Sequence, residues 1–255
     1  MRRNQALVKQ RAGRTTLGPA LAYDSPDLAE QIAHLGFDWV WLDWQHGQFT
    51  EATLNNALAR FLMLDSAPIV RVKSHEPGTI NRVLDMGAMG VMVPMVQNAA
   101  QAAEIVRATY YPPEGMRSAG GVRLELIGGT FEEYAARAND EIMLVVMVET
   151  EEAIANVREI MRVPGVDVVL IGPFDLLTDV RAKGGDKARH EQLVLEVAAA
   201  SKETGTPAGY VCETREMAER RIGQGFRFIN YGLDHFVLLG GMREIRELAR
   251  EWTGG

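Results

Sequence analysis

Short apolar segments recur along the chain, and most are followed by a stretch in which apolar residues repeat with helical spacing. A strand covered by helices on both faces has no polar face, so it appears in the sequence as a nearly continuous apolar run. We expect strands at residues 17–22, 37–43, 68–73, 90–96, 142–149, 167–172, 207–211 and 226–231. We expect helices at residues 27–35, 50–64, 79–86, 99–109, 150–161, 189–204, 214–224 and 242–252. The pattern therefore predicts a strand followed by a helix, repeated along the whole chain.

This alternation is typical of an α/β protein with a parallel sheet, and eight such units in a chain of 255 residues predict a closed (β/α)₈ TIM barrel. Gly36, Gly87 and Gly205 each fall between an expected helix and the next strand, where a positive φ would end the helix. The basic segment 1–16 predicts an N-terminal helix that caps the bottom of the barrel. We expect one domain over residues 1–255, with a long functional loop at residues 111–130.

The composition of the chain argues against some classes of binding partner. The net charge is −7, and no stripe of basic residues is present, which argues against nucleic-acid binding because phosphate neutralisation needs clustered Lys and Arg. No apolar run approaches the roughly 20 residues that a membrane-spanning helix needs. The single cysteine, Cys212, permits no internal disulfide and fits a cytoplasmic location. We therefore expect a small-molecule partner and assign Cys212 no role.

Two carboxylates follow successive apolar runs. Glu149 closes the run 142–148, and Asp175 follows the run 168–174. Consecutive strands in this architecture are usually parallel neighbours, so their carboxyl ends lie close together and hard oxygen ligands can converge there on Mg²⁺ or Mn²⁺. The alternative is that each carboxylate only caps the helix that follows it.

The end of the second expected strand carries Asp43 and, three residues later, His46. A carboxylate at this spacing can orient an imidazole and hold its tautomer, which is the arrangement of a general base. The alternative is a turn histidine with no catalytic task.

The third expected strand carries Arg71 and Lys73. A buried guanidinium needs an anionic partner, and either a carboxylate of the protein or the carboxylate of a substrate could provide it; the nearby metal site favours the substrate. Lys73 is the only lysine in a predicted strand and could form a Schiff base, but its neighbours Ser74, His75 and Glu76 favour a solvated position.

Several segments together resemble the HpcH/HpaI family of metal-dependent pyruvate aldolases. The resemblance extends over nearly the whole chain. It is carried by Gly36-Phe37-Asp38-Trp39, Asp43-Trp44-Gln45-His46-Gly47, Leu84-Asp85-Met86-Gly87-Ala88, Val93-Pro94-Met95-Val96, Tyr111-Pro112-Pro113-Glu114-Gly115-Met116-Arg117, Val148-Glu149-Thr150 and Ile171-Gly172-Pro173-Phe174-Asp175-Leu176.

The resemblance implies reversible cleavage of a 4-hydroxy-2-oxo acid to pyruvate and an aldehyde through a metal-stabilised enolate. It implies that Glu149 and Asp175 bind Mg²⁺, Mn²⁺ or Co²⁺ and that Arg71 holds the oxygens of the oxo acid. His46, oriented by Asp43, would be the base or would activate a metal-bound water, and Asp85 would reach the site of a neighbouring subunit. Substrate contacts are implied for Arg71, Met147, Gly172 and Pro173. A trimer or hexamer that exchanges its C-terminal helix between subunits is also implied.

The chain departs from the family pattern at Met147, where a glutamine is usual. A thioether cannot donate a hydrogen bond to a substrate, so this position implies altered specificity or weakened activity. Two other functions stay open. One is related enolate chemistry, such as oxaloacetate decarboxylation, citrate-type synthesis or the reaction of an ester-linked lyase. The other is a barrel that binds oxo acids without turning them over.

Overall fold

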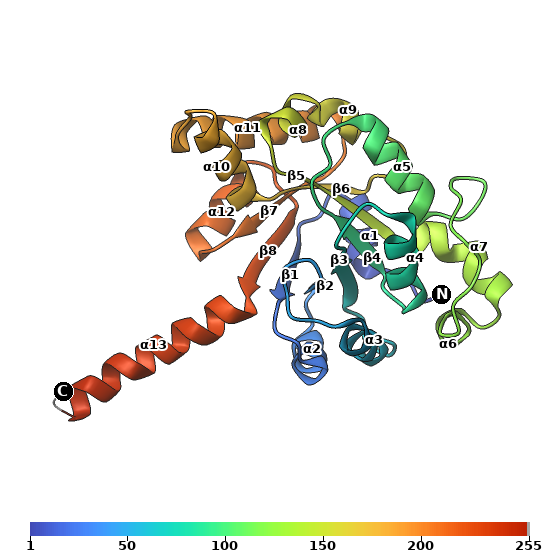
Figure 1. Cartoon of the computed structure of the whole chain (residues 1–255), viewed down its shortest axis with the longest axis horizontal. Coiled ribbons are helices and arrows are strands. Elements are labelled where there is room, and N and C mark those ends of the chain that lie inside the picture. Colours follow the sequence, from blue (N-terminus) through green and yellow to red (C-terminus); the bar gives the residue numbers. More distant parts are fainter. Residues whose placement is uncertain (254–255) are drawn as a thin grey trace.

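Eight parallel strands close into a barrel in a computed structural model that describes residues 1–253 (Figure 1). Each strand pairs with its neighbours in the sequence, and β1 pairs with β8 to close the ring, so the predicted TIM barrel is confirmed. The strands are β1 (Thr16–Leu21), β2 (Trp39–Asp43), β3 (Ala67–Arg71), β4 (Gly90–Val93), β5 (Met143–Val148), β6 (Val168–Ile171), β7 (Ala208–Cys212) and β8 (Phe228–Leu233).

Helices surround this ring and connect its strands (Figure 1). They are α1 (Gln5–Arg11), α2 (Pro26–Ala33), α3 (Glu51–Arg60), α4 (Pro77–Asp85), α5 (Ala99–Thr109), α6 (Leu124–Gly128), α7 (Phe131–Glu141), α8 (Glu151–Ala155), α9 (Val157–Met161), α10 (Pro173–Ala182), α11 (Lys187–Thr204), α12 (Arg215–Gly223) and α13 (Asp234–Thr253). Gly36, Gly87 and Gly205 have φ values of 82°, 99° and 82°, which confirms their predicted role as helix stops.

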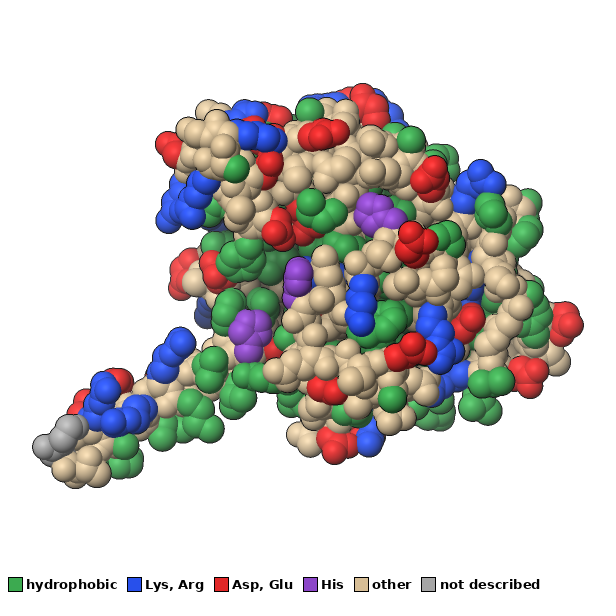
Figure 2. Space-filling view, in the orientation of Figure 1, with side chains coloured by type: hydrophobic (Ala, Val, Ile, Leu, Met, Phe, Trp, Pro, Cys, Tyr) green, Lys and Arg blue, Asp and Glu red, His purple; other side chains and the backbone are tan. Residues whose placement is uncertain are grey.

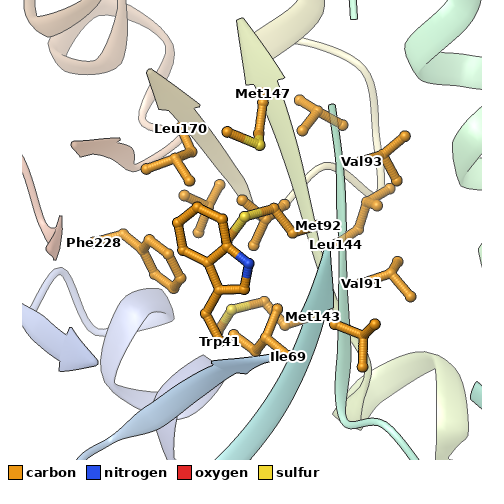
Figure 3. Packing of buried hydrophobic residues seen from close by; sticks show 14 of the residues in the cluster. Trp41, Ile69, Val91, Met92, Val93, Met143, Leu144, Met147, Leu170 and Phe228 are labelled. Carbon is orange, nitrogen blue, oxygen red and sulfur yellow. The ribbon is translucent and has the colours of Figure 1, made fainter. Parts of the chain in front are cut away.

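The strand register decides which side chains fill the barrel. Trp41, Met92, Met147 and Leu170 point toward one another inside the ring, whereas alternate residues such as Val91 point toward the helices (Figure 3). Successive side chains of a strand face opposite sides, so these inward residues continue into the positions at the carboxyl ends of the strands. The lumen is therefore a packed apolar core, and polar chemistry is confined to its mouth.

The N-terminal helix α1 closes the opposite end of the barrel, as predicted. The Asn4 amide donates to the Met89 carbonyl at 3.0 Å, and the Gln10 amide donates to the Thr16 hydroxyl at 2.7 Å. The same hydroxyl accepts from the Trp39 indole N–H at 3.0 Å. These hydrogen bonds satisfy polar groups that are buried under the barrel.

Several helical predictions were wrong. The expected long loop at residues 111–130 contains α6, and α7 and α10 were missed entirely. In α7 only Tyr134 and Ala138 are buried, too few to give a clear apolar period. In α10 the first residue is Pro173, which suits the first turn of a helix but also suggests a turn when only the sequence is known. The helix expected at residues 150–161 is interrupted at Asn156.

Helix α13 projects away from the barrel (Figure 1). It begins eight residues before the expected position, and none of its residues is buried. Hydrophobic side chains gather along one edge of this helix and charged ones along the other (Figure 2). Across residues 1–253, α13 included, no helix combines the length and the apolarity that crossing a membrane requires.

The close approach of β1 to β2 gives a testable prediction. A Cβ atom on Gly18 would lie 2.3 Å from Trp39 Cδ2, and that indole is stacked on Phe228 with a centroid distance of 4.0 Å. We expect Gly18→Ala to destabilise the protein by about 2–3 kcal/mol, because the stacked rings cannot yield without repacking. Gly78→Ala is the control, since a Cβ there has no neighbour within 4 Å. Equal urea-unfolding midpoints for the two variants would contradict this packing.

Candidate active site

The carboxylate of Glu149 is buried at the carboxyl end of β5. The residue is only 2% exposed, and its Oε2 accepts a 2.7 Å hydrogen bond from the backbone N–H of Met95. Burial raises the pKa of Glu149 to about 7. The Met95 hydrogen bond and the Arg71 charge lower this pKa, whereas the neighbouring Asp175 carboxylate raises it. The side chain is therefore a desolvated acid with a second carboxylate beside it.

Asp175 lies in the first turn of α10, which follows β6 through Gly172. A Cβ atom on Gly172 would lie 2.2 Å from Glu149 Oε1, so the glycine leaves the space that the glutamate occupies. The two carboxylates converge as the sequence predicted. Glu149 is not a capping residue, because the Thr150 side chain caps α8. Asp175 lies in the first turn of α10, where a negative charge also interacts favourably with the helix dipole, so the alternative stays open for this residue.

The donor set fits a hard divalent cation that keeps open positions. Among residues 1–253, no group of three or more His, Cys, Asp or Glu side chains is placed to hold a metal. Glu149 and Asp175 supply carboxylate oxygens alone, which suits Mg²⁺ or Mn²⁺ with water or substrate oxygens completing the shell. A closed structural zinc site would instead need four protein ligands.

Met95 was not predicted as a site residue. It follows β4 and has a φ of 57°, a left-handed conformation that is costly for a residue with a Cβ. This conformation accompanies the backbone hydrogen bond to Glu149. The sequence holds one signal, since Pro94 ends the strand directly before Met95, but the sign of φ cannot be deduced from it.

The partner of Arg71 is a carboxylate of the protein. Arg71 Nε donates to Asp43 Oδ1 at 2.9 Å, and Nη2 donates to Asp43 Oδ2 at 2.6 Å. The two residues are register neighbours on β2 and β3, and both are less than 9% exposed. Of the two partners that the sequence left open, the structure therefore shows the carboxylate of the protein, and the preference for a substrate carboxylate was wrong. No hydrogen bond is formed by Nη1 within residues 1–253, so the guanidinium keeps donors for a ligand.

The expected contact between Asp43 and the His46 imidazole is not formed. Asp43 Oδ1 instead accepts the backbone N–H of His46 at 3.2 Å and that of Gln45 at 3.1 Å. The carboxylate is held by Arg71 and these two amides, and the exposed imidazole of His46 forms no hydrogen bond within residues 1–253. Asp43 fixes the turn that carries His46 and does not orient its ring.

Met147 lies below Glu149 inside the barrel, as strand alternation predicted. Its side chain is 1% exposed and packs with the lumen residues that include Trp41 and Leu170 (Figure 3). The Arg71 guanidinium lies over the Trp41 ring, 4.6 Å from its centroid. The Trp41 ring thus separates the guanidinium from the apolar core of the barrel. The floor of the site is thus apolar, and the polar groups of Arg71, Glu149 and Asp175 lie above it.

Lys73 and Cys212 do not act as nucleophiles in this arrangement. The ammonium of Lys73 lies on the exposed side of the Trp44 ring, 4.4 Å from its centroid, rather than inside the barrel where a Schiff base would form. Cys212 is buried, and its burial raises the thiol pKa to about 12. A thiol with this pKa is uncharged near neutral pH, which agrees with assigning it no role.

Asp85 lies apart from the other candidates. It is the last residue of α4, which returns from the mouth toward the start of β4, and it accepts a 2.8 Å hydrogen bond from Arg117 Nη2. Arg117 is buried between Tyr111 and Tyr134. Asp85 thus does not converge on the mouth of its own barrel, and its contact with the site of a neighbouring subunit stays a prediction.

Comparisons with known proteins point to one family. The sequence profile described as HpcH/HpaI aldolase/citrate lyase matches residues 21–240. The 4-hydroxy-2-oxovalerate aldolase of Novosphingobium aromaticivorans is 37% identical over 241 residues, which cover 91% of this chain and 88% of that protein. The 4-hydroxy-2-oxo-heptane-1,7-dioate aldolase of Escherichia coli is 35% identical over 230 residues, covering 89% and 88%. A family member of known structure from Burkholderia cenocepacia has a TM-score of 0.89 at 29% identity, covering 97% and 99%.

The buried pair of Asp43 and Arg71 gives the prediction for this site. Asp43→Asn leaves a guanidinium without its counter-charge, so we expect a loss of about 3–5 kcal/mol in the free energy of unfolding. The double variant Asp43→Asn, Arg71→Met removes both charges and is expected to recover part of that loss. The exposed pair of Arg215 and Glu219 is the control, because solvent screens its charges and its coupling should be much weaker than that of the buried pair. Additive effects of the two buried substitutions in denaturant titrations would show that the charges are not coupled.

Proposed function

Because the chain belongs to the HpcH/HpaI aldolase/citrate lyase family, we propose that it is a pyruvate aldolase, a carbon–carbon lyase that cleaves a 4-hydroxy-2-oxo acid to pyruvate and an aldehyde. The observation that carries this proposal is the convergence of Glu149 and Asp175 across the mouth of the barrel from Arg71. Two relatives that are more than 30% identical to this chain over most of their length are named as aldolases of 4-hydroxy-2-oxo acids.

Glu149 and Asp175 are the residues that would hold a divalent cation. The cation would polarise the 2-oxo group and offset the negative charge that develops on its oxygen as the carbon–carbon bond breaks. Arg71 contributes from the other edge of the mouth, because its donors beyond those used by Asp43 can bind the carboxylate of the oxo acid. Asp43 keeps that guanidinium fixed, so the donors are in place before the substrate binds.

Cleavage requires a base for the proton of the 4-hydroxyl group. His46 stands at the mouth with an exposed imidazole and a backbone fixed by Asp43. The imidazole accepts the hydroxyl proton, the C3–C4 electron pair passes into the enolate of pyruvate, and the C4 hydroxyl becomes the carbonyl of the aldehyde. Protonation of the enolate at C3 then gives pyruvate. Met147 supplies no hydrogen bond in this scheme, so its contribution is apolar contact.

The first prediction of this proposal concerns the two carboxylates. In D₂O with Mn²⁺, we expect the protein to exchange the methyl protons of pyruvate, and Glu149→Gln or Asp175→Asn to slow this exchange at least about 100-fold. Proton NMR measures the exchange without a choice of aldehyde. Glu152→Gln, which removes an exposed carboxylate on α8, is the control and should exchange normally. Undiminished exchange in Asp175→Asn would contradict the metal assignment.

Cation binding should also be visible in thermal unfolding. A ligand at 100 times its dissociation constant stabilises the folded state by about 2.7 kcal/mol, so Mn²⁺ should raise the melting temperature of the unsubstituted protein. The same cation should leave Glu149→Gln unchanged, although this variant should be the more stable protein without Mn²⁺ because it has lost a buried charge. An equal Mn²⁺ shift in both proteins would place the cation elsewhere.

We also propose that α13 packs against a second copy of the chain in a trimer or hexamer. The helix is 20 residues long and has no buried residue of its own, yet it carries a set of large apolar side chains. An isolated helix gains little stability in water without a packed face, and a contiguous apolar patch usually marks an interface. The exposed apolar residues are Phe236, Val237, Leu238, Leu239, Met242, Ile245, Leu248 and Trp252.

Light scattering on the eluting protein tests this assembly. Leu238 and Ile245 lie on the same face of α13, so the double variant Leu238→Asp, Ile245→Asp should lower the measured mass toward that of one 28.2 kDa chain. Glu247→Gln, on the charged face, should keep the mass of the unsubstituted assembly. A full-length protein that elutes as a monomer would refute the proposed assembly.

A further inference from the structure

A single backbone N–H, that of Met95, holds the carboxylate of Glu149. Within residues 1–253, Met95 is the only backbone donor to this carboxylate, and its N–H donates to Oε2 at 2.7 Å. The other oxygen, Oε1, lies against Gly172, at the start of the helix that carries Asp175. The hydrogen bond from Met95 therefore determines which oxygen of Glu149 is left for a cation.

Met95 makes this contact from an unfavourable conformation. Its φ of 57° is left-handed, and a residue with a Cβ atom is more stable at a negative φ. Relaxation would turn the peptide plane between Pro94 and Met95, and the N–H with it. On one side the turn is held because the N–H of Val96 donates to the carbonyl of Met147 at 3.0 Å. The surrounding structure has to supply the rest of the restraint.

Gln97, two residues after Met95, is held at each of its polar groups. Its backbone N–H donates to Gln101 Oε1 at 2.8 Å, and its carbonyl accepts from Asn156 Nδ2 at 2.9 Å. Its side-chain oxygen accepts from the Thr150 hydroxyl, and its side-chain amide donates weakly to the Met95 carbonyl at 3.4 Å. Asn156 is the residue at which α8 ends and α9 begins, so the interruption of the helix supplies a donor to Gln97.

The hydrogen bond between Gln97 and Thr150 leads back to the metal site, because Thr150 directly follows Glu149. The Thr150 hydroxyl accepts the N–H of Ala153 at 3.1 Å, and its own proton is donated to Gln97. Glu149, Met95, Gln97 and Thr150 therefore form a closed ring of two hydrogen bonds and two short pieces of backbone. The ring restricts how far the Met95 N–H can move from the carboxylate.

We propose that Gln97 is a positioning residue, which fixes the left-handed Met95 turn against Thr150 and so keeps Glu149 oriented with Oε1 available to a divalent cation. The inference rests on the proposed metal-dependent aldolase function. Gln97 is not a ligand in this scheme, because its side-chain oxygen is bound to the Thr150 hydroxyl. Groups that orient a metal ligand typically contribute about 10–100-fold to metal affinity, which sets the size of the expected effect.

The Met95 N–H can be followed by NMR in protein labelled with ¹⁵N at its 12 methionines. A Met95→Leu spectrum identifies the signal. Without any cation, we expect Gln97→Leu to speed exchange of the Met95 amide proton with solvent at least about tenfold, because the turn relaxes. The amide protons of Met89 and Met143 donate to backbone carbonyls of neighbouring strands and should exchange as before. Unchanged exchange at Met95, or faster exchange at all three, would overturn the assignment.

Mn²⁺ affinity shows whether this restraint serves the proposed site. Electron paramagnetic resonance measures the free ion during a titration and needs no substrate. We expect Gln97→Leu to weaken Mn²⁺ binding about tenfold or more. Gln192→Leu, the same change at an exposed position of α11, is the control and should bind Mn²⁺ normally. Loss of protection at Met95 with full Mn²⁺ affinity would refute the positioning role.

Thr150 gives an independent pair of variants. Thr150→Ser keeps the hydroxyl, so it should retain both the protection of Met95 and the Mn²⁺ affinity. Thr150→Val removes the hydroxyl and should reproduce the effects of Gln97→Leu. The double variant Gln97→Leu, Thr150→Val should lose about as much Mn²⁺ affinity as either single variant, because all three break the same hydrogen bond. Losses that multiply in the double variant would contradict the closed ring.

The two measurements separate this inference from the function on which it rests. Exchange at Met95 requires neither a cation nor turnover. Tight Mn²⁺ binding that is the same in the unsubstituted protein and in Gln97→Leu refutes the role of Gln97 alone. An unsubstituted protein that binds no Mn²⁺ refutes the metal-dependent function and the role of Gln97 with it.

Discussion

The buried carboxylate of Glu149 is the constraint around which the mouth of the barrel is built. A carboxylate with 2% exposure loses most of its hydration, and burial raises its pKa to about 7 although Met95 donates a hydrogen bond to it. Two unusual features of the backbone accompany this charge. Met95 holds a positive φ, and Gly172 leaves the volume that its own Cβ would otherwise fill. The hydrogen bond from Met95 and the space left by Gly172 hold this carboxyl group in place, although its burial disfavours the charged form.

The charged side chains on the two edges of the mouth are stabilised in different ways. On one edge Asp43 and Arg71 form a bidentate pair, which is close to neutral as a unit and is fixed by the register of β2 and β3. On the other edge the Asp175 carboxylate lies beside Glu149 and raises the pKa of Glu149. An added cation on this second edge would remove both the repulsion and part of the desolvation penalty. The preformed pair, in contrast, needs no ligand to be stable.

The strands were predictable because each is buried on both faces and so appears in the sequence as an apolar run. The closing of the sheet into a barrel was predictable from the number of strands, which is eight. The positions of Glu149 and Asp175 followed from the same pattern. The pairing of Asp43 with Arg71 did not, because sequence spacing favours the nearby His46 and only the strand register brings residue 71 alongside residue 43. The left-handed Met95 was also out of reach, since nothing in a Pro-Met dipeptide fixes the sign of φ.

The packed side chains inside the barrel limit how deep a ligand can bind, and so determine which residues can contact it. Met147 and Trp41 fill the barrel directly under the mouth. Met147 has only a thioether, and the indole N–H of Trp41 is buried without a partner in the described chain. A ligand cannot sink below this surface without displacing packed side chains, which costs several kcal/mol. Its polar atoms must therefore be satisfied from the rim. Selection between substrates then depends on the side chains that follow the ends of the strands rather than on the barrel interior.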